Sequence, residues 1–274
     1  MKESLNKGQL KKGLYILPSL FTCGNITFGL LSVFTSIDGG FINAAWFLVG
    51  ALTCDILDGR IARLTKTTSD FGMQLDSLSD LVSFGVAPAT LMYMLILNQM
   101  GNVGIGIAVL FVICSALRLA KFNVIALQHE GVSKEFHGLP TPASAGIIVS
   151  FVLSYELVGD QNPLNIKTIP ALMQSMPYFF KAMPIVMIAL SFLMVSNIPY
   201  SSFKKLDISK PRKMSLLVII IVVALLIIVY PQNIIFIIFF VYALSGIILY
   251  IPMHVIKKNK EKDREPSEYE FGEL

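Results

Sequence analysis

Long apolar runs alternate with short polar segments along most of the chain. A helix that crosses a bilayer needs about 20 predominantly apolar residues. Runs of roughly that length predict spans at 16–36, 42–64, 78–97, 103–122, 141–158, 178–196, 215–230 and 233–255. The last two runs are separated only by a turn at Pro231, so they should form a tight helical hairpin. The pattern predicts an all-α polytopic membrane protein with about eight transmembrane helices.

The composition excludes an ordinary soluble protein. The 274 residues are 54% hydrophobic and 15% charged, with a mean hydropathy of +0.69. A soluble domain carries roughly 25% charged residues. The predicted spans occupy most of the chain, which leaves no room for a sizeable soluble domain beside the membrane domain.

The basic residues indicate the orientation of these spans, because cytoplasmic loops retain Lys and Arg. With eight spans and both termini in the cytoplasm, only Lys167 and Lys181 of the 22 basic residues fall on the opposite side. An odd number of spans would scatter the basic residues over both sides. We therefore expect a multi-pass protein of the cytoplasmic (inner) membrane, with a polar cytoplasmic N-terminus at 1–14 and a charged cytoplasmic tail at 257–274.

Four aspartates at regular spacing interrupt the apolar pattern: Asp55, Asp58, Asp76 and Asp80. Asp55 and Asp58 are three residues apart and share a helix face, and Asp76 and Asp80 share a face of the next helix. The short connection predicts antiparallel helices whose acidic faces meet at the cytoplasmic end. Acids cost a few kcal/mol next to hydrocarbon, so acids inside a membrane are functional candidates.

Four converging carboxylates require positive charge among them. A set of oxygen ligands without His or Cys suits Mg²⁺ or Mn²⁺, and two ions suit a site that handles a phosphoryl group. Gly59 and Ala62 leave the helix face bare for a bulky ligand such as a nucleotide, while Arg63 and Arg60 offer donors for phosphate oxygens. The alternative is that the acids only form salt bridges with Arg60, Arg63 or Lys66 at a helix end.

These residues carry a family resemblance. The spacing D-x2-D-G-x2-A-R-x8-G-x3-D-x3-D, from Asp55 to Asp80, resembles the signature of the CDP-alcohol phosphotransferases, and every signature position is filled. The resemblance implies transfer of a substituted phosphate from a CDP-linked donor to an alcohol, with release of CMP. It also implies a six-helix catalytic core, which we place at 15–200, followed by a basic loop and the C-terminal hairpin at 201–256.

The resemblance also implies roles for individual residues. Asp55, Asp58 and Asp76 would ligate metal, and Asp80 would ligate the second metal and act as the base that deprotonates the attacking hydroxyl. Gly59, Ala62 and Gly72 would make room for cytidine and ribose, and Arg63 would hold the diphosphate. Thr22 and Asn25 belong to the pattern Pro18-x3-Thr22-x2-Asn25-x3-Gly29, which is similar to the family's first helix beside the nucleotide.

Two further stretches bear on the acceptor alcohol. The sequences from Leu117 to Asn123 and from Phe136 to Gly146, with the two extra C-terminal spans, resemble the membrane-embedded phosphatidylserine synthases of bacteria and archaea. That subgroup uses CDP-diacylglycerol and L-serine. Arg118 is the first candidate for the serine carboxylate and Lys121, where the subgroup usually has Arg, is the second. Asn123 is a candidate polar contact. Anchoring of the fourth span by Arg118 and Lys121 is the structural alternative, and His137 either shapes its loop or contacts substrate.

Other functions remain open at this stage. The same chemistry with glycerol 3-phosphate or inositol phosphate as acceptor would call for more Arg or Lys near the site than the sequence offers. A cation transporter would place its acids near the bilayer midplane, often with inverted repeats, and none is detectable here. The expected partners are CDP-diacylglycerol, L-serine, membrane lipids and, from the family resemblance, a second copy in a homodimer; no nucleic acid is expected.

Overall fold

The structure is a computed structural model of the chain. It describes residues 2–65, 69–128, 136–156 and 170–200, and beyond them residues 237, 241–243 and 246. The predicted spans at 215–230 and 233–255 and the tail at 257–274 therefore lie almost entirely outside the described residues. So does Lys66.

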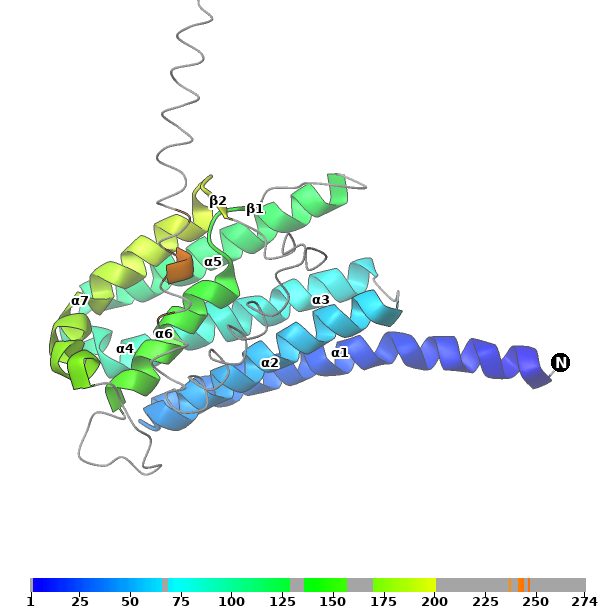
Figure 1. The fold of residues 1–274 in the computed structure, drawn as a ribbon, viewed down its shortest axis with the longest axis horizontal. Helices are drawn as coiled ribbons and strands as arrows, with labels where there is room; N and C mark the ends of the chain where they lie inside the picture. The colour runs from blue at the N-terminus through cyan, green and yellow to red at the C-terminus, as the bar shows by residue number, and fades with distance from the viewer. Residues whose placement is uncertain are drawn as a thin grey trace, which may run out of the picture.

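The described residues form a helical bundle (Figure 1). In chain order the elements are α1 (Lys2–Ile37), α2 (Phe41–Thr65), α3 (Asp70–Asp80), the π-helix η1 (Leu81–Val86), α4 (Ala87–Leu95), the 3₁₀-helix η2 (Leu97–Met100), α5 (Asn102–Gln128), β1 (Phe136–His137), α6 (Thr141–Glu156), α7 (Pro170–Val195) and β2 (Pro199–Tyr200). The expected all-α architecture is confirmed for this part of the chain, apart from the two-residue pairing of β1 with β2.

Several of these helices suit a membrane. In the described part of the chain, four helical segments are long and apolar enough to cross it: Pro18–Ile37, Phe41–Thr65, Asp70–Leu95 and Asn102–Ile125. Large apolar side chains on their outer faces are exposed, including Phe34, Val103 and Leu117. Bilayer hydrocarbon is the solvent in which such surfaces are stable. The chain is thus a helical, multi-pass membrane protein.

The third span begins earlier than its hydropathy predicts. We expected it to start at residue 78, but α3 begins at Asp70 and continues through η1 into α4. Ser69 caps the N-terminus of α3 by accepting a hydrogen bond from the Gly72 N–H at 3.0 Å. Two polar residues of α3 bond to other helices, Ser77 to the Asn123 side chain and Ser79 to the Thr22 carbonyl, so they lower the apolar score without ending the helix. Asp76 and Asp80 therefore lie well inside a continuous helical segment.

Helix α1 packs along α2 and also contacts α3, η1 and α4. Its contact with η1 is close at Gly29, because a Cβ there would collide with the Ser83 side chain and lie 2.9 Å from the Ser83 Cα. Two serine hydroxyls, one on α3 and one on η1, bond to the backbone of α1 along the same contact. Ser79 donates to the Thr22 carbonyl at 3.2 Å, and Ser83 donates to the Asn25 carbonyl at 2.9 Å. We call this contact of α1 with α3 and η1 the α1 seam. This seam fixes α1 beside the acidic helix.

A second tie joins the segment just before α6 to the segment just after α7. β1 pairs antiparallel with β2, with His137 opposite Pro199. Gly138 follows with a φ of +84°, and a Cβ there would collide with the Met194 carbonyl oxygen. The Gly138 N–H donates to the Ile198 carbonyl at 2.9 Å. His137 thus belongs to a loop whose course is set by backbone pairing and by this glycine.

Candidate active site

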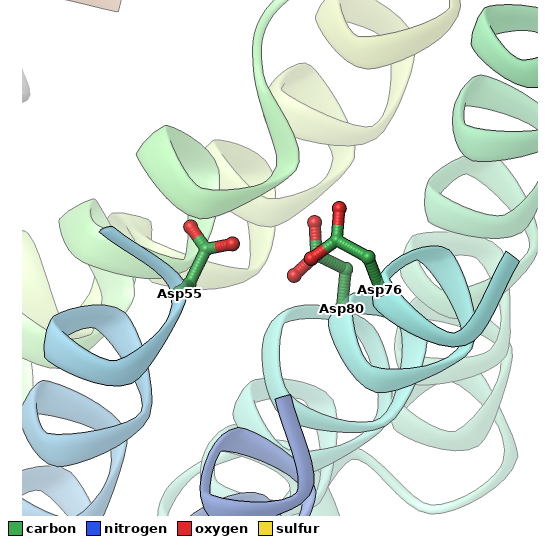
Figure 2. A group of neighbouring side chains, drawn as sticks. All are labelled: Asp55, Asp76 and Asp80. Atoms are coloured by element: carbon green, nitrogen blue, oxygen red, sulfur yellow. The ribbon is translucent and has the colours of Figure 1, made fainter. Parts of the chain in front are cut away.

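Three of the four predicted aspartates come together between α2 and α3. Carboxylate oxygens of Asp55, Asp76 and Asp80 all lie within 4.8 Å of one another. Figure 2 shows Asp55 on α2 facing Asp76 and Asp80 on α3, with the carboxylates turned toward a common space. The spacing of four residues places Asp76 and Asp80 on one face of α3, and the antiparallel approach of α2 brings Asp55 opposite them.

Asp58 lies beside this cluster and is held by α1. Its side chain is only 4% exposed, and its Oδ2 accepts a hydrogen bond from the Thr22 hydroxyl at 3.0 Å. It interacts electrostatically with Asp55, Asp76 and Asp80. All four acids therefore share one electrostatic environment, as the spacing predicted, although the tight group of ligand atoms consists of the other three.

The residues present fit a hard divalent cation. The buried Oδ1 of Asp76 has no hydrogen-bond partner, and a buried polar atom without a partner is costly. The neighbouring donors are carboxylate oxygens, the ligand type that Mg²⁺ and Mn²⁺ prefer. Of the three cations in the salt-bridge alternative, Arg60 and Arg63 are exposed and Lys66 lies outside the described residues. Asp55, Asp76 and Asp80 are the residues that would hold the metal, with Asp58 adjoining.

A cavity of about 340 Å³ opens beside the acids and between α1, α2 and α3. We call it the α1–α3 cavity. Its lining residues are Pro18, Ser19, Thr22, Asp58, Gly59, Ala62, Arg63, Ser69, Asp70, Gly72, Met73 and Asp76. Five of the six residues expected at the nucleotide are in this set, and Asp58 and Asp76 connect it to the acidic cluster. The atom nearest to a Cβ at Gly59 would be an Arg63 guanidinium nitrogen at 3.8 Å, so the helix face at Gly59 is open.

Asn25 is the exception among the expected nucleotide contacts. Its side chain is 0% exposed and is absent from the lining of the α1–α3 cavity. Its amide nitrogen donates to Asp80 Oδ1 at 3.4 Å. In this structure Asn25 bonds to the acidic cluster and does not line the cavity; its expected contact with the nucleotide stays a prediction.

The residues expected at serine divide into two groups. Arg118 on α5 is near the acids: it interacts electrostatically with Asp80, and its Nη1 donates to the Thr141 hydroxyl at 2.7 Å. Its buried Nε has no hydrogen-bond partner.

The other two candidates point elsewhere. Lys121 is exposed and donates to Asn197 Oδ1 at 2.7 Å, which ties α5 to the loop after α7. Asn123 bonds to α3, with its amide nitrogen 3.1 Å from Gln74 Oε1 and its oxygen accepting from the Ser77 hydroxyl at 3.0 Å. Both act as links between helices in this structure.

Sequence reasoning missed several residues that the structure brings to the site. Ser19, Ser69, Asp70 and Met73 line the α1–α3 cavity, and Thr141 contacts Arg118. Ser69 had a readable signal, because a serine directly before the polar start of a helix is a common N-cap. Thr141 lies in the stretch from Phe136 to Gly146 that bears on the acceptor, but its contact with Arg118, 23 positions away, could not be read from the sequence.

Comparison with known proteins agrees with this geometry. The sequence model of the CDP-alcohol phosphatidyltransferase family matches residues 15–183, a range that contains the acidic cluster, the α1–α3 cavity and Arg118. The chain belongs to this family. The resemblance read from the motif is confirmed.

Individual relatives cover most of the chain. A CDP-diacylglycerol–serine O-phosphatidyltransferase from Helicobacter pylori is 35% identical over 254 residues, which cover 90% of this chain and 97% of the relative. The protein of the same name from Methanocaldococcus jannaschii is 32% identical over 222 residues, covering 81% and 91%. An archaetidylserine synthase from Methanothermobacter thermautotrophicus is 38% identical over 186 residues, covering 67% and 69%.

Proposed function

We propose that this membrane protein transfers the phosphatidyl group from CDP-diacylglycerol to the hydroxyl of L-serine, giving phosphatidylserine and CMP. The observation that supports the proposal is that three features lie next to one another. They are the acidic cluster, the α1–α3 cavity lined by Asp58 and Asp76, and Arg118, which interacts with Asp80. The relatives named as serine phosphatidyltransferases over nearly their full length support the choice of acceptor.

On the donor side, the α1–α3 cavity takes the cytidine diphosphate part of the donor. Gly59, Ala62 and Gly72 present little side chain to it, and Arg63 supplies a guanidinium for phosphate oxygens. The cavity is built from helices whose outer faces meet lipid, so the acyl chains can stay in the bilayer while the head group enters sideways.

Metal would be held by Asp55, Asp76 and Asp80, with Asp58 as the adjoining fourth acid. Bound Mg²⁺ or Mn²⁺ neutralises charge on the diphosphate and on the departing CMP. Two ions and the division of the four acids between them are part of the proposal.

On the acceptor side, Arg118 binds the serine carboxylate while Asp80 takes the proton from the serine hydroxyl. The hydroxyl oxygen then forms a bond to the phosphorus that carries diacylglycerol, and the bond from that phosphorus to the CMP oxygen breaks. In serine the hydroxyl and carboxylate are separated by two carbon atoms, so their protein partners must be near neighbours. The electrostatic interaction of Arg118 with Asp80 supports this pairing.

Asn25 holds the carboxylate of Asp80, and Thr22 holds that of Asp58. A base must be oriented as well as ionised, and the α1 seam supplies that orientation. Lys121 and Asn123 are assigned here to the framework that keeps α5 against α3 and α7, rather than to serine itself.

The finer topology is also part of the proposal. It comprises eight spans, both termini in the cytoplasm and an active site that opens to the cytoplasm of a cell with an inner membrane. The distribution of basic residues supports it. Accessibility labelling of single cysteines in the loops tests it, with a periplasmic N-terminus as the contradicting result. The expected homodimer is tested by the mass of the detergent-solubilised protein.

The acceptor is tested by CMP release from purified protein with CDP-diacylglycerol and Mn²⁺ or Mg²⁺. Separate reactions receive L-serine, glycerol 3-phosphate or inositol phosphate. We expect release that depends on serine and disappears when EDTA removes the metal. Release with a phosphorylated alcohol alone would contradict the serine assignment, and full activity in EDTA would contradict the metal site.

A further inference from the structure

The guanidinium of Arg118 is held at one end and has an unpaired donor on its other edge. Its Nη1 donates to the Thr141 hydroxyl oxygen at 2.7 Å, while its buried Nε has no hydrogen-bond partner. In the fixed fork of a guanidinium, Nη1 lies on the side of Cδ, and N–H groups of Nε and Nη2 point the same way along the other edge, which we call the Nε edge. Such an edge binds a carboxylate through two parallel hydrogen bonds. Because a buried N–H without a partner is costly, the Nε edge of Arg118 suits an anionic ligand.

Thr141 is a rigid support for the other end of this guanidinium. It is the first residue of α6 and is 0% exposed. Its carbonyl accepts a hydrogen bond from the Ser144 hydroxyl at 2.8 Å, and the segment just before it is tied to α7, where the Leu139 N–H donates to the Leu193 carbonyl at 3.0 Å. The β-branched side chain of a threonine also has few χ1 rotamers. The hydroxyl oxygen therefore accepts the Arg118 N–H from a fixed position.

The hydrogen bond between Arg118 and Thr141 has a structural alternative, in which it only ties α5 to α6. Lys121 and Asn197 form such a tie between α5 and the loop after α7. A tie of this kind does not require an unpaired Nε, and burying one without a partner costs stability. A long side chain that binds a ligand, in contrast, needs its rotamer locked by neighbours. The bond at Nη1 and the unpaired Nε together favour a ligand-binding arginine over a tie.

We propose that Thr141 is a positioning residue for the acceptor: its hydroxyl oxygen holds Nη1 of Arg118, so that the Nε edge binds the serine carboxylate. This inference rests on the proposed function of Arg118. It also assigns a role to the segment from Phe136 to Gly146, which carries Thr141 and is tied by its backbone to α7. The acceptor is then bound by a pair of residues on α5 and α6, whereas the donor cavity is formed by α1, α2 and α3.

The test compares Thr141→Val, which removes the hydroxyl and keeps the shape, with the matched control Thr90→Val. Thr90 on α4 bonds to the Val86 carbonyl of its own helix at 3.0 Å and lines an apolar groove formed with α5. We expect Thr141→Val to raise the KM for L-serine about fivefold, the effect of one lost hydrogen bond. Thr141→Ser restores the hydroxyl and should return this KM to within twofold of wild type. The KM for CDP-diacylglycerol and the kcat at saturating serine should stay within twofold throughout, as should all constants of the control.

A double-mutant cycle with Arg118→Ala shows whether Thr141 acts through Arg118. In the Arg118→Ala background, Thr141→Val should add no further increase in the KM for serine. If Thr141→Val does not fold, Thr141→Cys takes its place, because a thiol is a weak acceptor.

Three results would contradict parts of this account. If Arg118→Ala raises the KM for serine but Thr141→Val matches the Thr90→Val control, the positioning role is wrong and the proposed function stands. If Arg118→Ala leaves this KM unchanged, the carboxylate assignment itself is wrong. Equal increases in both KM values for Thr141→Val, or additive effects in the cycle, would show that the hydrogen bond only ties α5 to α6.

Discussion

The donor side and the acceptor side of this site are assembled in different ways. The α1–α3 cavity and the acidic cluster draw on residues between Pro18 and Asp80, on helices that follow one another in the chain. The acceptor side joins Arg118 on α5 to Thr141 on α6. Helical spacing within one stretch of sequence makes the first group readable, while the second depends on contacts between distant segments. The sequence of such a site can therefore identify the reaction type without identifying the acceptor.

Asp80 is the point that both sides share, so its loss should have the largest effect. Asp80→Asn keeps an oxygen that can accept from Asn25 but removes the base, and we expect kcat to fall by about 10²–10⁴-fold. The KM for CDP-diacylglycerol should change little, because Asp80 is absent from the lining of the cavity.

The matched control is Asp38→Asn, an exposed aspartate just after the end of α1 and far along that helix from the site. It should turn over at the wild-type rate. Unchanged turnover in Asp80→Asn would remove Asp80 from the role of base.

Arg118→Ala should damage the acceptor side alone. The loss of a charged hydrogen-bonding partner corresponds to about a 10- to 100-fold increase in the KM for L-serine. The KM for the lipid donor should stay close to wild type, because Arg118 does not line the α1–α3 cavity. Initial rates measured while each substrate is varied in turn give both constants. A parallel increase in the two KM values would mean that the two sides are not separate.

Gly59→Leu should damage the donor side alone. The Cβ at Gly59 faces open space in the cavity, so the helix can accept the larger side chain while the nucleotide loses room. We expect the KM for CDP-diacylglycerol to rise about tenfold, with the serine KM unchanged.

Gly106→Leu on α5 is the matched control, because a Cβ there meets nothing within 4 Å and Gly106 lies outside the cavity. It should leave both constants unchanged. A selective rise in the serine KM for Gly59→Leu would reverse the assignment of the two sides.

Gly29→Ala should have the smallest effect on turnover and act through stability. The added methyl group would press on Ser83, including its backbone, and overpacking of this kind costs about 1–3 kcal/mol. We expect a lower melting temperature in detergent than for Gly106→Ala, where the methyl group meets open space. Equal melting temperatures would show that the α1–η1 seam is not tightly packed.

The sequence predicted the parts of the molecule that obey local rules. The span at Phe41–Thr65 follows from its apolar run, and the convergence of Asp55, Asp76 and Asp80 follows from helical spacing. The start of α3 could not be read from hydropathy, because polar residues such as Ser77 and Ser79, which bond to other helices, lower the apolar score. The hydrogen bond from Asn25 to Asp80 could not be predicted from the sequence either. A motif does not distinguish a residue that contacts the ligand from one that orients a catalytic side chain.

Lys121 and Asn123 were expected to contact serine, but in the structure both bond to other residues. Both stand within three turns of the end of α5 and within five residues of Arg118, so a motif that contains all three suggests a common role. Successive positions on a helix point in different directions, and the structure turns Lys121 to Asn197 and Asn123 to Gln74. Only contacts in three dimensions separate the residue near the acids from its neighbours.

Incorporation of labelled L-serine into lipid by the purified protein tests the central claim most directly. With CDP-diacylglycerol and Mn²⁺ or Mg²⁺ present, we predict one labelled lipid molecule for each CMP released, no labelled lipid in EDTA, and none from Asp80→Asn. Metal-dependent CMP release without label in the lipid, in protein that binds CDP-diacylglycerol, would contradict the transfer to serine.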